Sequence, residues 1–528
     1  MAWRKGNSAS CAFCYTLYKT RKLVTNNFID LMDPFSAVFI ENIHHTLTFL
    51  DTRRDILSVA TSVSTQWHTQ CSDDKLWRLL FKRDWGATEK IIPLYPVFRV
   101  EQNIKLLGHA STFYQAYVMW ENLLARTRGN NGKNADVRKS FCRAAKAWEK
   151  VFLFDRHHMP QLLSDHSQQQ ELHFPQLRIG KIQEQGMGHL HSSLLAFFAC
   201  VDGQLKLPTR GHNNFEGHTA GQMGGFQVYG EFHCSILNTL EHCLDLRNTL
   251  RLQTRKPDLF LLPLTSGTVM YQETQMFRFI CVDGNTAEMF HLCFHISGPM
   301  SCTPMKRATN GSAILLLDWW EEFASRLTLN CYVPGKIFGK NHPGKIGIDL
   351  FPRIQPLMVA CETNGIRVEA STIHFGEGRG WTYSIRLKLV DAQLLPGWSC
   401  ERQGFYGAQL MMRHWEIRDS SSAEVRRVDG PGVIGNFPVL HTGGYLDFGH
   451  NNFNAEGVEV VDETGWFIYQ SMSGNMSNLS TFGGRLTFVI NRDGKDMSDS
   501  GRCENFSSLD SFDVVVPTFV LNRQEFYF

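Results

Sequence analysis

Residues 31–86 constrain the fold of this chain more than any other stretch of comparable length. Apolar residues from Phe35 to Leu50 recur at three- and four-residue spacing, which predicts an amphipathic helix. Asp33 and Pro34 precede this stripe and suit the N-cap and first turn of such a helix. We therefore expect the stretch to begin with a short helix that has one wide apolar face.

Two further apolar sets follow within the same stretch. One runs from Ile56 to Trp67, with Asp55 near its start, where a carboxylate suits the helix dipole. The other comprises Leu76, Trp77, Leu79, Leu80 and Trp85. Three such helices have more apolar surface than they can cover among themselves, so the pattern predicts a docking element. The alternative is an ordinary helical subdomain packed on its own chain.

This pattern resembles the F-box, the resemblance resting on Pro34, Leu47-Thr48-Phe49-Leu50-Asp51, Asp55-Ile56-Leu57, Val63-Ser64-Thr65-Gln66-Trp67 and Leu76-Trp77-Arg78. In that family the helices dock on the Skp-type adaptor of an SCF (cullin–RING) ubiquitin ligase. The resemblance implies adaptor contacts by Pro34, Phe35, Ile43, Leu47, Leu50, Ile56, Leu57, Val63 and Trp67.

Length and composition exclude several classes of protein. The chain has 528 residues, 43% of them hydrophobic, enough for three or four domains with their own cores. A net charge of +2 gives no electrostatic attraction to nucleic acid or an anionic membrane. The N-terminus lacks the pattern of a signal peptide, and no apolar run is long enough to span a bilayer. The fourteen irregularly spaced cysteines favour a reducing cytoplasmic or nuclear location.

Two turn-rich stretches divide the rest of the chain. Residues 126–143 are rich in Gly and Asn, and residues 331–356 contain four prolines and four glycines. The predicted organisation is an extension (1–30), the F-box-like stretch (31–86), a helical extension (87–125), a linker (126–143), an α+β domain (144–330), a second linker (331–356) and a β domain (357–522).

The middle segment has a mixed helix and strand pattern. It resembles the SUKH (Smi/Knr-type) α+β family in a helix around Trp148, the Asp202-Gly203-Gln204 turn, Gly225-Phe226 and a helix around Trp319. The resemblance implies a binding scaffold rather than an enzyme. His291 and His295 have a spacing that suits zinc on a helix, but the local sequence alternates as a strand does.

The strand pattern argues against a zinc site at these histidines, and no metal or other cofactor is expected for the chain. The Cys11-x-x-Cys14 pair also lacks a second pair at zinc-finger spacing.

The last third predicts several short antiparallel strands, among them residues 365–370, 381–389, 409–417, 486–490 and a stretch that ends before Pro517. Three motifs there resemble the ApaG domain, an immunoglobulin/fibronectin-like sandwich: Arg413-His414-Trp415-x-Ile417-x-Asp419, Gly430-Pro431-Gly432-Val433-Ile434-Gly435-x-x-Pro438 and Val516-Pro517-x-Phe519-x-Leu521. Residues 451–465 and 494–509 have the composition of loop insertions.

The glycines at 430, 432 and 435 match a nucleotide-binding spacing, but that mechanism needs a helix directly after them. Pro431 and the strand-like sequence that follows argue against such a helix, so the glycines are expected to permit positive φ in a tight loop. The backbone N–H groups of this loop could still bind an anion.

Arg413 and Trp415 share one face of their strand, and His414 points to the other. They form either a buried Trp covered by an Arg stem or an exposed recognition patch. Under the second interpretation the target-binding residues are Arg413, Trp415, Gly430, Gly432 and Gly435.

The predicted fold is a multidomain α+β chain with an N-terminal helical F-box, a central α+β SUKH-like domain and a C-terminal all-β sandwich. This order of domains resembles F-box-only proteins. It implies a non-catalytic substrate receptor whose partners are a Skp-type adaptor, cullin and RING subunits and a protein substrate. Two alternatives stay open: a phosphate-compound-binding enzyme that uses the glycine loop, and an adaptor-bound scaffold without ubiquitin transfer.

Overall fold

The computed structural model describes two compact units, residues 1–90 with 110–119, and residues 91–109 with 120–528. The residues it describes within them are 73–85, 112, 113, 117, 134–158, 190–200, 223–228, 231–250, 252, 258–271, 274–295, 300–335, 347–374, 380–390, 407–422, 424–433, 435–441, 444–447, 458–460, 465–473, 476–491, 511–522 and 525–528. No helix within these ranges is long and apolar enough to cross a membrane.

The first unit contains the helix α4 (Asp74–Trp85), which was predicted from the third apolar set of the F-box-like stretch. Its buried face is formed by Leu76, Trp77, Leu80, Phe81 and Trp85. Leu79, also in the predicted set, is instead 48% exposed. Tyr117 packs its ring 5.1 Å from that of Trp77 and donates a 2.6 Å hydrogen bond to Asp84 Oδ2. The nine residues predicted to contact the adaptor lie outside the described ranges.

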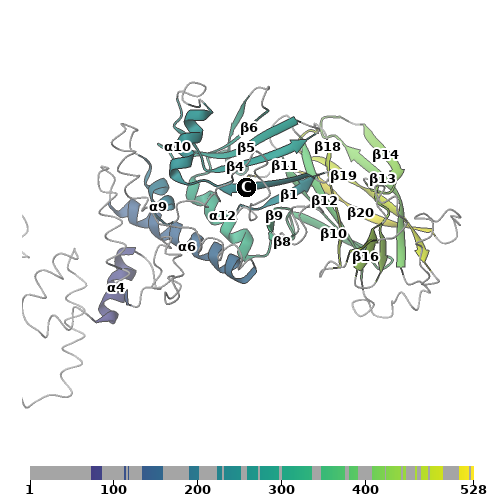
Figure 1. Ribbon diagram of the computed structural model, residues 1–528, viewed down its shortest axis with the longest axis horizontal. Coiled ribbons are helices and arrows are strands. Elements are labelled where there is room, and N and C mark those ends of the chain that lie inside the picture. Colours follow the sequence, from purple (N-terminus) through teal and green to yellow (C-terminus); the bar gives the residue numbers. More distant parts are fainter. Residues whose placement is uncertain are drawn as a thin grey trace, which may run out of the picture. The chain divides into compact units, whose positions relative to one another are not determined.

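The second unit begins with an α+β part that is built around a nine-stranded sheet (Figure 1). The strand order is β7-β6-β5-β4-β2-β1-β9-β8, with β3 paired to β5. Neighbouring strands are antiparallel except β1 and β9. The strands are β1 (Gly225–Val228), β2 (Glu231–Leu237), β3 (Leu261–Pro263), β4 (Thr265–Tyr271), β5 (Thr274–Asp283), β6 (Met289–His295), β7 (Ser301–Pro304), β8 (Val333–Gly335) and β9 (Gly347–Asp349).

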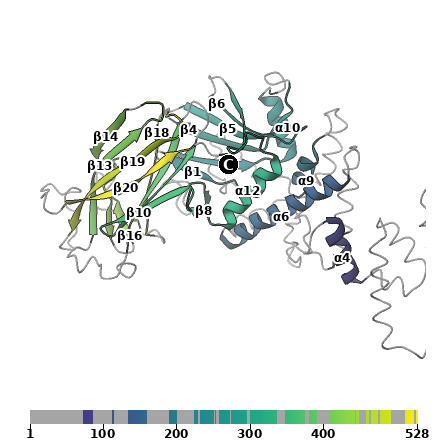
Figure 2. The same cartoon turned by 180° about the vertical axis from the view of Figure 1, so that it is seen from behind.

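Four helices accompany this sheet: α6 (Asn134–His158), α9 (Ser192–Cys200), α10 (Leu240–Thr249) and α12 (Leu316–Thr328). Three of them meet through aromatic side chains that are fully buried. The ring of Trp148 on α6 lies 4.3 Å from that of Trp320 on α12 and 5.4 Å from that of Phe197 on α9. The view from behind shows α6 and α12 side by side (Figure 2).

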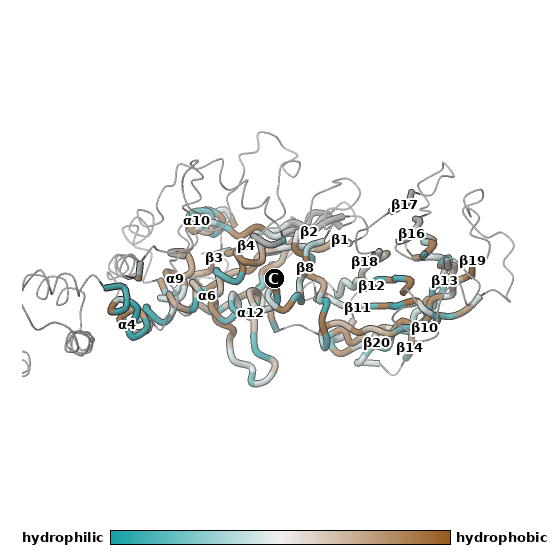
Figure 3. The backbone as a smooth tube through the Cα atoms, turned by 90° about the horizontal axis from the view of Figure 1, so that it is seen from below, coloured by the Kyte–Doolittle hydropathy of each residue, from teal (hydrophilic) through white to brown (hydrophobic). Residues whose placement is uncertain are grey.

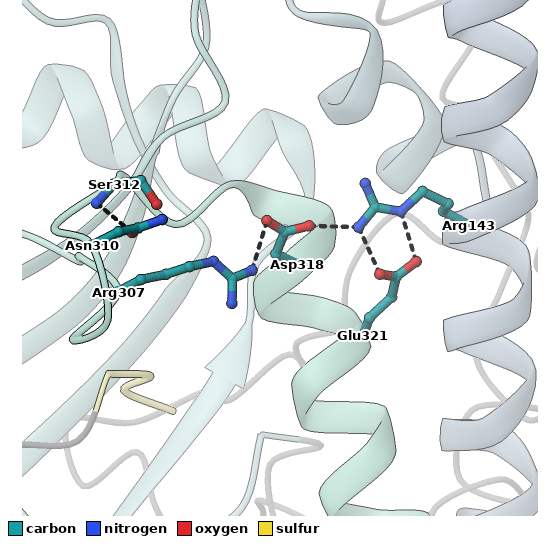
Figure 4. Close-up of polar contacts among 6 residues, drawn as sticks. All are labelled: Arg143, Arg307, Asn310, Ser312, Asp318 and Glu321. Carbon is teal, nitrogen blue, oxygen red and sulfur yellow. Dashed lines mark hydrogen bonds and ion pairs between the residues drawn. The ribbon is translucent and has the colours of Figure 1, made fainter.

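An ion-pair network also connects α6 to α12 (Figure 4). Arg143 on α6 donates to both Asp318 and Glu321 on α12, each at 2.6 Å. The second carboxylate oxygen of Asp318 accepts from Arg307, which precedes a tight turn closed by Asn310 and Ser312. These hydrogen bonds to Asp318 and Glu321 raise the pKa of Arg143. The network fixes the lateral position of α12, which carries much of the aromatic core.

The structure therefore has the α+β class predicted for residues 144–330, while the SUKH resemblance stays a prediction. Two segments expected to be linkers contribute regular structure. α6 begins at Asn134, inside the stretch 126–143, and the stretch 331–356 supplies β8 and β9 to the central sheet. His291 and His295 lie on strand β6, as their alternating sequence predicts.

The last part of the unit consists of two antiparallel sheets around a shared core. One sheet has the order β10-β11-β12-β18, and the other β17-β16-β15-β13-β19-β20, with β14 beside β13. Hydrophobic and hydrophilic residues alternate along much of β11 and β12 (Figure 3), as expected for strands with one face toward the core, although both faces of these strands are largely buried. The strands are β10 (Met358–Thr363), β11 (Ile366–His374), β12 (Trp381–Leu389), β13 (Gly407–Arg418), β14 (Val425–Pro431), β15 (Val439–His441), β16 (Gly444–Asp447), β17 (Val458–Val460), β18 (Phe467–Ser473), β19 (Ser480–Asn491) and β20 (Ser511–Leu521).

One predicted strand end differs from the structure. Alternation in the sequence predicts a last strand that ends before Pro517, but β20 continues through Pro517 to Leu521. The register shifts at this point, because Phe482 pairs with Phe519 whereas Gly484 pairs with Val516. β20 is also the last strand of its sheet. A proline without an N–H group is tolerated at such an irregularity on an edge strand.

After β20 the chain returns to the central part, where residues Glu525–Phe528 form what we name the C-terminal strap (Figure 1). Phe526, Tyr527 and Phe528 are all buried. Arg278 Nη1 donates to the carbonyl oxygen of Phe528, and Trp319 Nε1 donates to that of Tyr527, both at 2.7 Å. The Tyr527 hydroxyl also lies 2.8 Å from Nδ1 of His374 on β11. The strap thus contacts both the central part and the sandwich.

Candidate binding site on the sandwich

The structure brings Arg413 together with two of the predicted glycines. Arg413 on β13 and Gly430 on β14 are directly paired across the two strands. A Cβ atom added to Gly430 would lie 2.9 Å from Arg413 Nη2, so the guanidinium occupies the space that a side chain would need. Arg413 Nη1 donates to the carbonyl oxygens of Pro431 at 2.9 Å and Gly432 at 2.8 Å. The arginine therefore holds the end of β14 and the start of the loop in place.

The loop after β14 is a tight turn rather than the start of a helix. Val433 and Asn436 exchange two backbone hydrogen bonds of 3.0 and 2.9 Å, and the next element is the strand β15. Gly432 and Gly435 both have positive φ, at +53° and +75°. The prediction that these glycines serve a tight loop is confirmed, and the dinucleotide-binding geometry is absent from these residues because no helix N-terminus faces the loop.

Trp415 lies in the sandwich core and is 4% exposed. Its ring packs 5.2 Å from that of Phe482 and is stacked 6.3 Å from that of Tyr469. Of the two interpretations drawn from the sequence, the structure shows the buried Trp. Trp415 is therefore part of the core, and among the predicted target-binding residues only Arg413 and the glycines remain available to a partner.

On the opposite face of β13, polar side chains form a row across four strands. Nδ1 of His414 lies 2.7 Å from Asp429 Oδ1 on β14, and Nε2 lies 3.2 Å from Thr487 Oγ1 on β19. Thr487 Oγ1 donates in turn to Asp513 Oδ1 on β20 at 2.7 Å. The threonine proton is thus directed to a carboxylate and not to the imidazole, so Thr487 is not activated as a nucleophile.

This polar row was missed by the sequence analysis, which placed only His414 on the outer face. Alternation along one strand indicates which face a residue occupies. The partners of His414, by contrast, follow from the pairing of β13 with β14 and β19, and strand alternation does not define that register. Among the described residues, no group of three His, Cys, Asp or Glu side chains is arranged to hold a metal ion.

Comparison with known proteins supports the assignment of the sandwich. Residues 377–452 match the family model of the ApaG domain. The protein ApaG of Rhodospirillum centenum is 32% identical over 68 residues, which cover 13% of this chain and 42% of that protein. The putative ApaA protein from Bordetella pertussis, a crystal structure, is 20% identical over 30% of this chain and 93% of its own, with a TM-score of 0.19.

A longer match is to the F-box protein SKIP16 of Arabidopsis thaliana, which is 30% identical over 185 residues. That match covers 33% of this chain and 35% of the relative. The chain thus spans about a third of the length of this curated relative. The chain is thus similar to an F-box protein over 185 residues, and its residues 377–452 match the ApaG domain.

Proposed function

We propose that this chain is the substrate-recognition subunit of an SCF-type cullin–RING ubiquitin ligase. Residues 31–86 dock on the Skp-type adaptor, and the downstream domains hold a protein target near the ubiquitin-charged enzyme. The observation that carries this proposal is the 30% identity to an F-box protein over 185 residues. The F-box-like spacing of the apolar residues supports it independently of that similarity.

A subunit of this kind accelerates ubiquitin transfer by proximity, since it raises the effective concentration of the target lysine. It needs no catalytic group of its own. We place the assembly in the cytoplasm or nucleus, and eight cysteines among the described residues are free, as a reducing location requires.

On the sandwich, we propose Arg413 and the loop from Gly430 to Gly435 as the target-binding surface. Two carbonyl oxygens hold the guanidinium in a fixed orientation. The described residues offer no partner to its Nε and Nη2 groups, which leaves these donors for a ligand. A fixed guanidinium recognises a carboxylate or phosphate group well, because its planar donors match the oxygens of either group. We therefore expect an acidic or phosphorylated segment of the target at this site.

Adaptor docking is tested by affinity purification of the full chain and of a variant that lacks residues 31–86. The proposal predicts that the adaptor and cullin disappear from the second sample while the target remains. Recovery of the adaptor by the shortened chain would refute adaptor docking through residues 31–86.

The target surface is tested with Arg413→Lys, which keeps the positive charge but loses the planar fork. Arg418→Lys is the matched control, since Arg418 lies at the exposed end of the same strand. We expect ubiquitination of the captured target in a reconstituted ligase to fall only for Arg413→Lys. Capture without any ubiquitination of the target by the wild-type chain would favour the scaffold alternative. Saturable heat on titration with nucleotides would favour the enzyme alternative.

A further inference from the structure

The outer face of the sheet β10-β11-β12-β18 is buried and polar. Along β12, the core-facing residues alternate with Thr382, Ser384 and Arg386, which point away from the sandwich core. These three residues are nevertheless only 0, 1 and 1% exposed. Ser371 on β11 is also buried, at 1% exposure. Other parts of the second unit therefore cover this face, although its side chains are those of a solvent-facing strand.

The register of β11 and β12 groups four of these side chains. Glu369 is directly opposite Arg386, and Ser371 is directly opposite Ser384. Residues two apart on a strand share a face, and directly opposed residues have Cβ atoms about 5 Å apart. The guanidinium, the carboxylate and the two hydroxyls consequently share one patch of the sheet.

Most of the donors in this patch have no acceptor. Arg386 Nη2 donates to Glu369 Oε2 at 2.7 Å, but Nε and Nη1 of Arg386 have no partner among the described residues. The hydroxyl groups of Ser371 and Ser384 have none either. Nearly all buried polar groups in proteins are hydrogen-bonded, so a cluster of unpartnered ones calls for a further partner such as water or an ion.

A second arginine, Arg353 of the central part, lies near this patch of β11 and β12. Arg353 follows strand β9 and pairs with Asp349 at 2.7 Å, while its Nε has no partner among the described residues. Burial, and after it the charge of Arg353, lower the pKa of Arg386 to about 10. The two guanidinium groups are thus close enough to repel each other.

The buried charges of this cluster balance, because Arg353 and Arg386 pair with Asp349 and Glu369, and the third arginine, Arg367, is 44% exposed at its edge. The unpartnered groups of Arg353 and Arg386 can only donate hydrogen bonds, and the two serine hydroxyls can donate as well. An anion with several oxygen atoms accepts from donors on different strands at once, and guanidinium groups form their strongest hydrogen bonds with such oxygens.

We propose that the interface between strands β11 and β12 and the segment after β9 binds a small oxyanion of the phosphate or sulfate type. Its oxygens accept from Arg386, Arg353, Ser371 and Ser384. Because these donors come from both the central part and the sandwich, the bound anion holds the two parts together. The proposal does not depend on adaptor docking.

The test uses the full-length chain, dialysed exhaustively against a volatile buffer without phosphate or sulfate. We expect native mass spectrometry to show one added phosphate after titration with inorganic phosphate. We also expect the thermal midpoint to rise with phosphate or sulfate but not with sodium chloride of equal ionic strength. Phosphate at 100 times its dissociation constant would raise the folded-to-unfolded ratio about 100-fold.

Ser384→Ala is the first variant, because it removes one donor and no charge. It should weaken phosphate binding several-fold while the chain stays folded. Arg386→Met should abolish the phosphate-dependent rise, whereas Arg418→Met, at an exposed position, should keep it in full. Equal rises in all variants, no rise over sodium chloride, or a crystal structure with water alone at these donors would overturn the proposal.

Discussion

The C-terminal strap gives the sharpest test of how the second unit is held together. Phe528 is 4% exposed, and its ring packs against those of Trp319, Phe323 and Tyr332 at 5.7, 5.3 and 5.9 Å. The guanidinium of Arg326 lies 5.0 Å from the centre of the same ring. Phe528→Ala removes a buried aromatic side chain from this cluster. Such truncations destabilise a protein by about 3–5 kcal/mol, because they lose burial and leave a cavity.

A loss of this size lowers the folded-to-unfolded ratio by roughly a hundred- to several-thousand-fold, since each 1.4 kcal/mol is tenfold. The assay is urea unfolding followed by tryptophan fluorescence, which reports on Trp319 beside the ring. Val520→Ala is the control, since Val520 lies only eight positions earlier and is 48% exposed. We expect it to change stability by less than about 0.5 kcal/mol. A loss below about 1 kcal/mol for Phe528→Ala would refute the packing of the strap.

Three further predictions concern single side chains. Trp415→Ala should lower the free energy of unfolding by about 3–5 kcal/mol, because the ring is buried; a loss below 1 kcal/mol would show that it is not. Gly432→Ala should lower the free energy of unfolding more than Gly311→Ala does, since Gly311→Ala adds only the roughly 1–2 kcal/mol of backbone strain at positive φ. Both glycines have positive φ, but only the new Cβ at 432 meets a backbone oxygen, that of Asn436, and equal losses in urea unfolding would contradict this. Burial lowers the pKa of His191 from 6.5, so the neutral ring stabilises the fold above pH 6.5, and this stability is lost as the pH falls. His191→Gln should flatten that dependence in thermal melts between about pH 7.5 and 5.5, and an unchanged slope would exclude His191 as its source.

One strand with strict alternation was predicted to the residue, while the predicted stretch 365–370 became the longer strand β11. The stretch 381–389 alternates throughout and became β12 with the same bounds. The start of α6 was not predictable from composition, because Gly and Asn dominate the stretch before Asn134. The buried apolar residues Phe141 and Cys142 nevertheless begin the helical face inside the predicted linker, and Ala144 and Ala145 continue it. Their spacing was the signal that could have identified it.

Contacts between segments that are distant in the chain could not be predicted from the local sequence. Arg278 and Phe528 are 250 positions apart, and nothing in either neighbourhood indicates that one binds the other. Arg386 reads as an ordinary solvent-facing residue of an alternating strand, yet it is buried. Such outcomes depend on which segments cover a sheet face, and local periodicity defines only the two faces themselves.

We propose above that residues 31–86 dock on the adaptor. A binding isotherm of the full chain with purified Skp-type adaptor measures this interaction directly. The wild-type chain should bind at saturable stoichiometry, and Leu50→Asp should abolish binding, because a carboxylate replaces an apolar contact. Leu329→Asp is the control, since Leu329 is 63% exposed in the other unit and should leave the affinity unchanged. Equal affinity of Leu50→Asp and the wild-type chain would contradict the account.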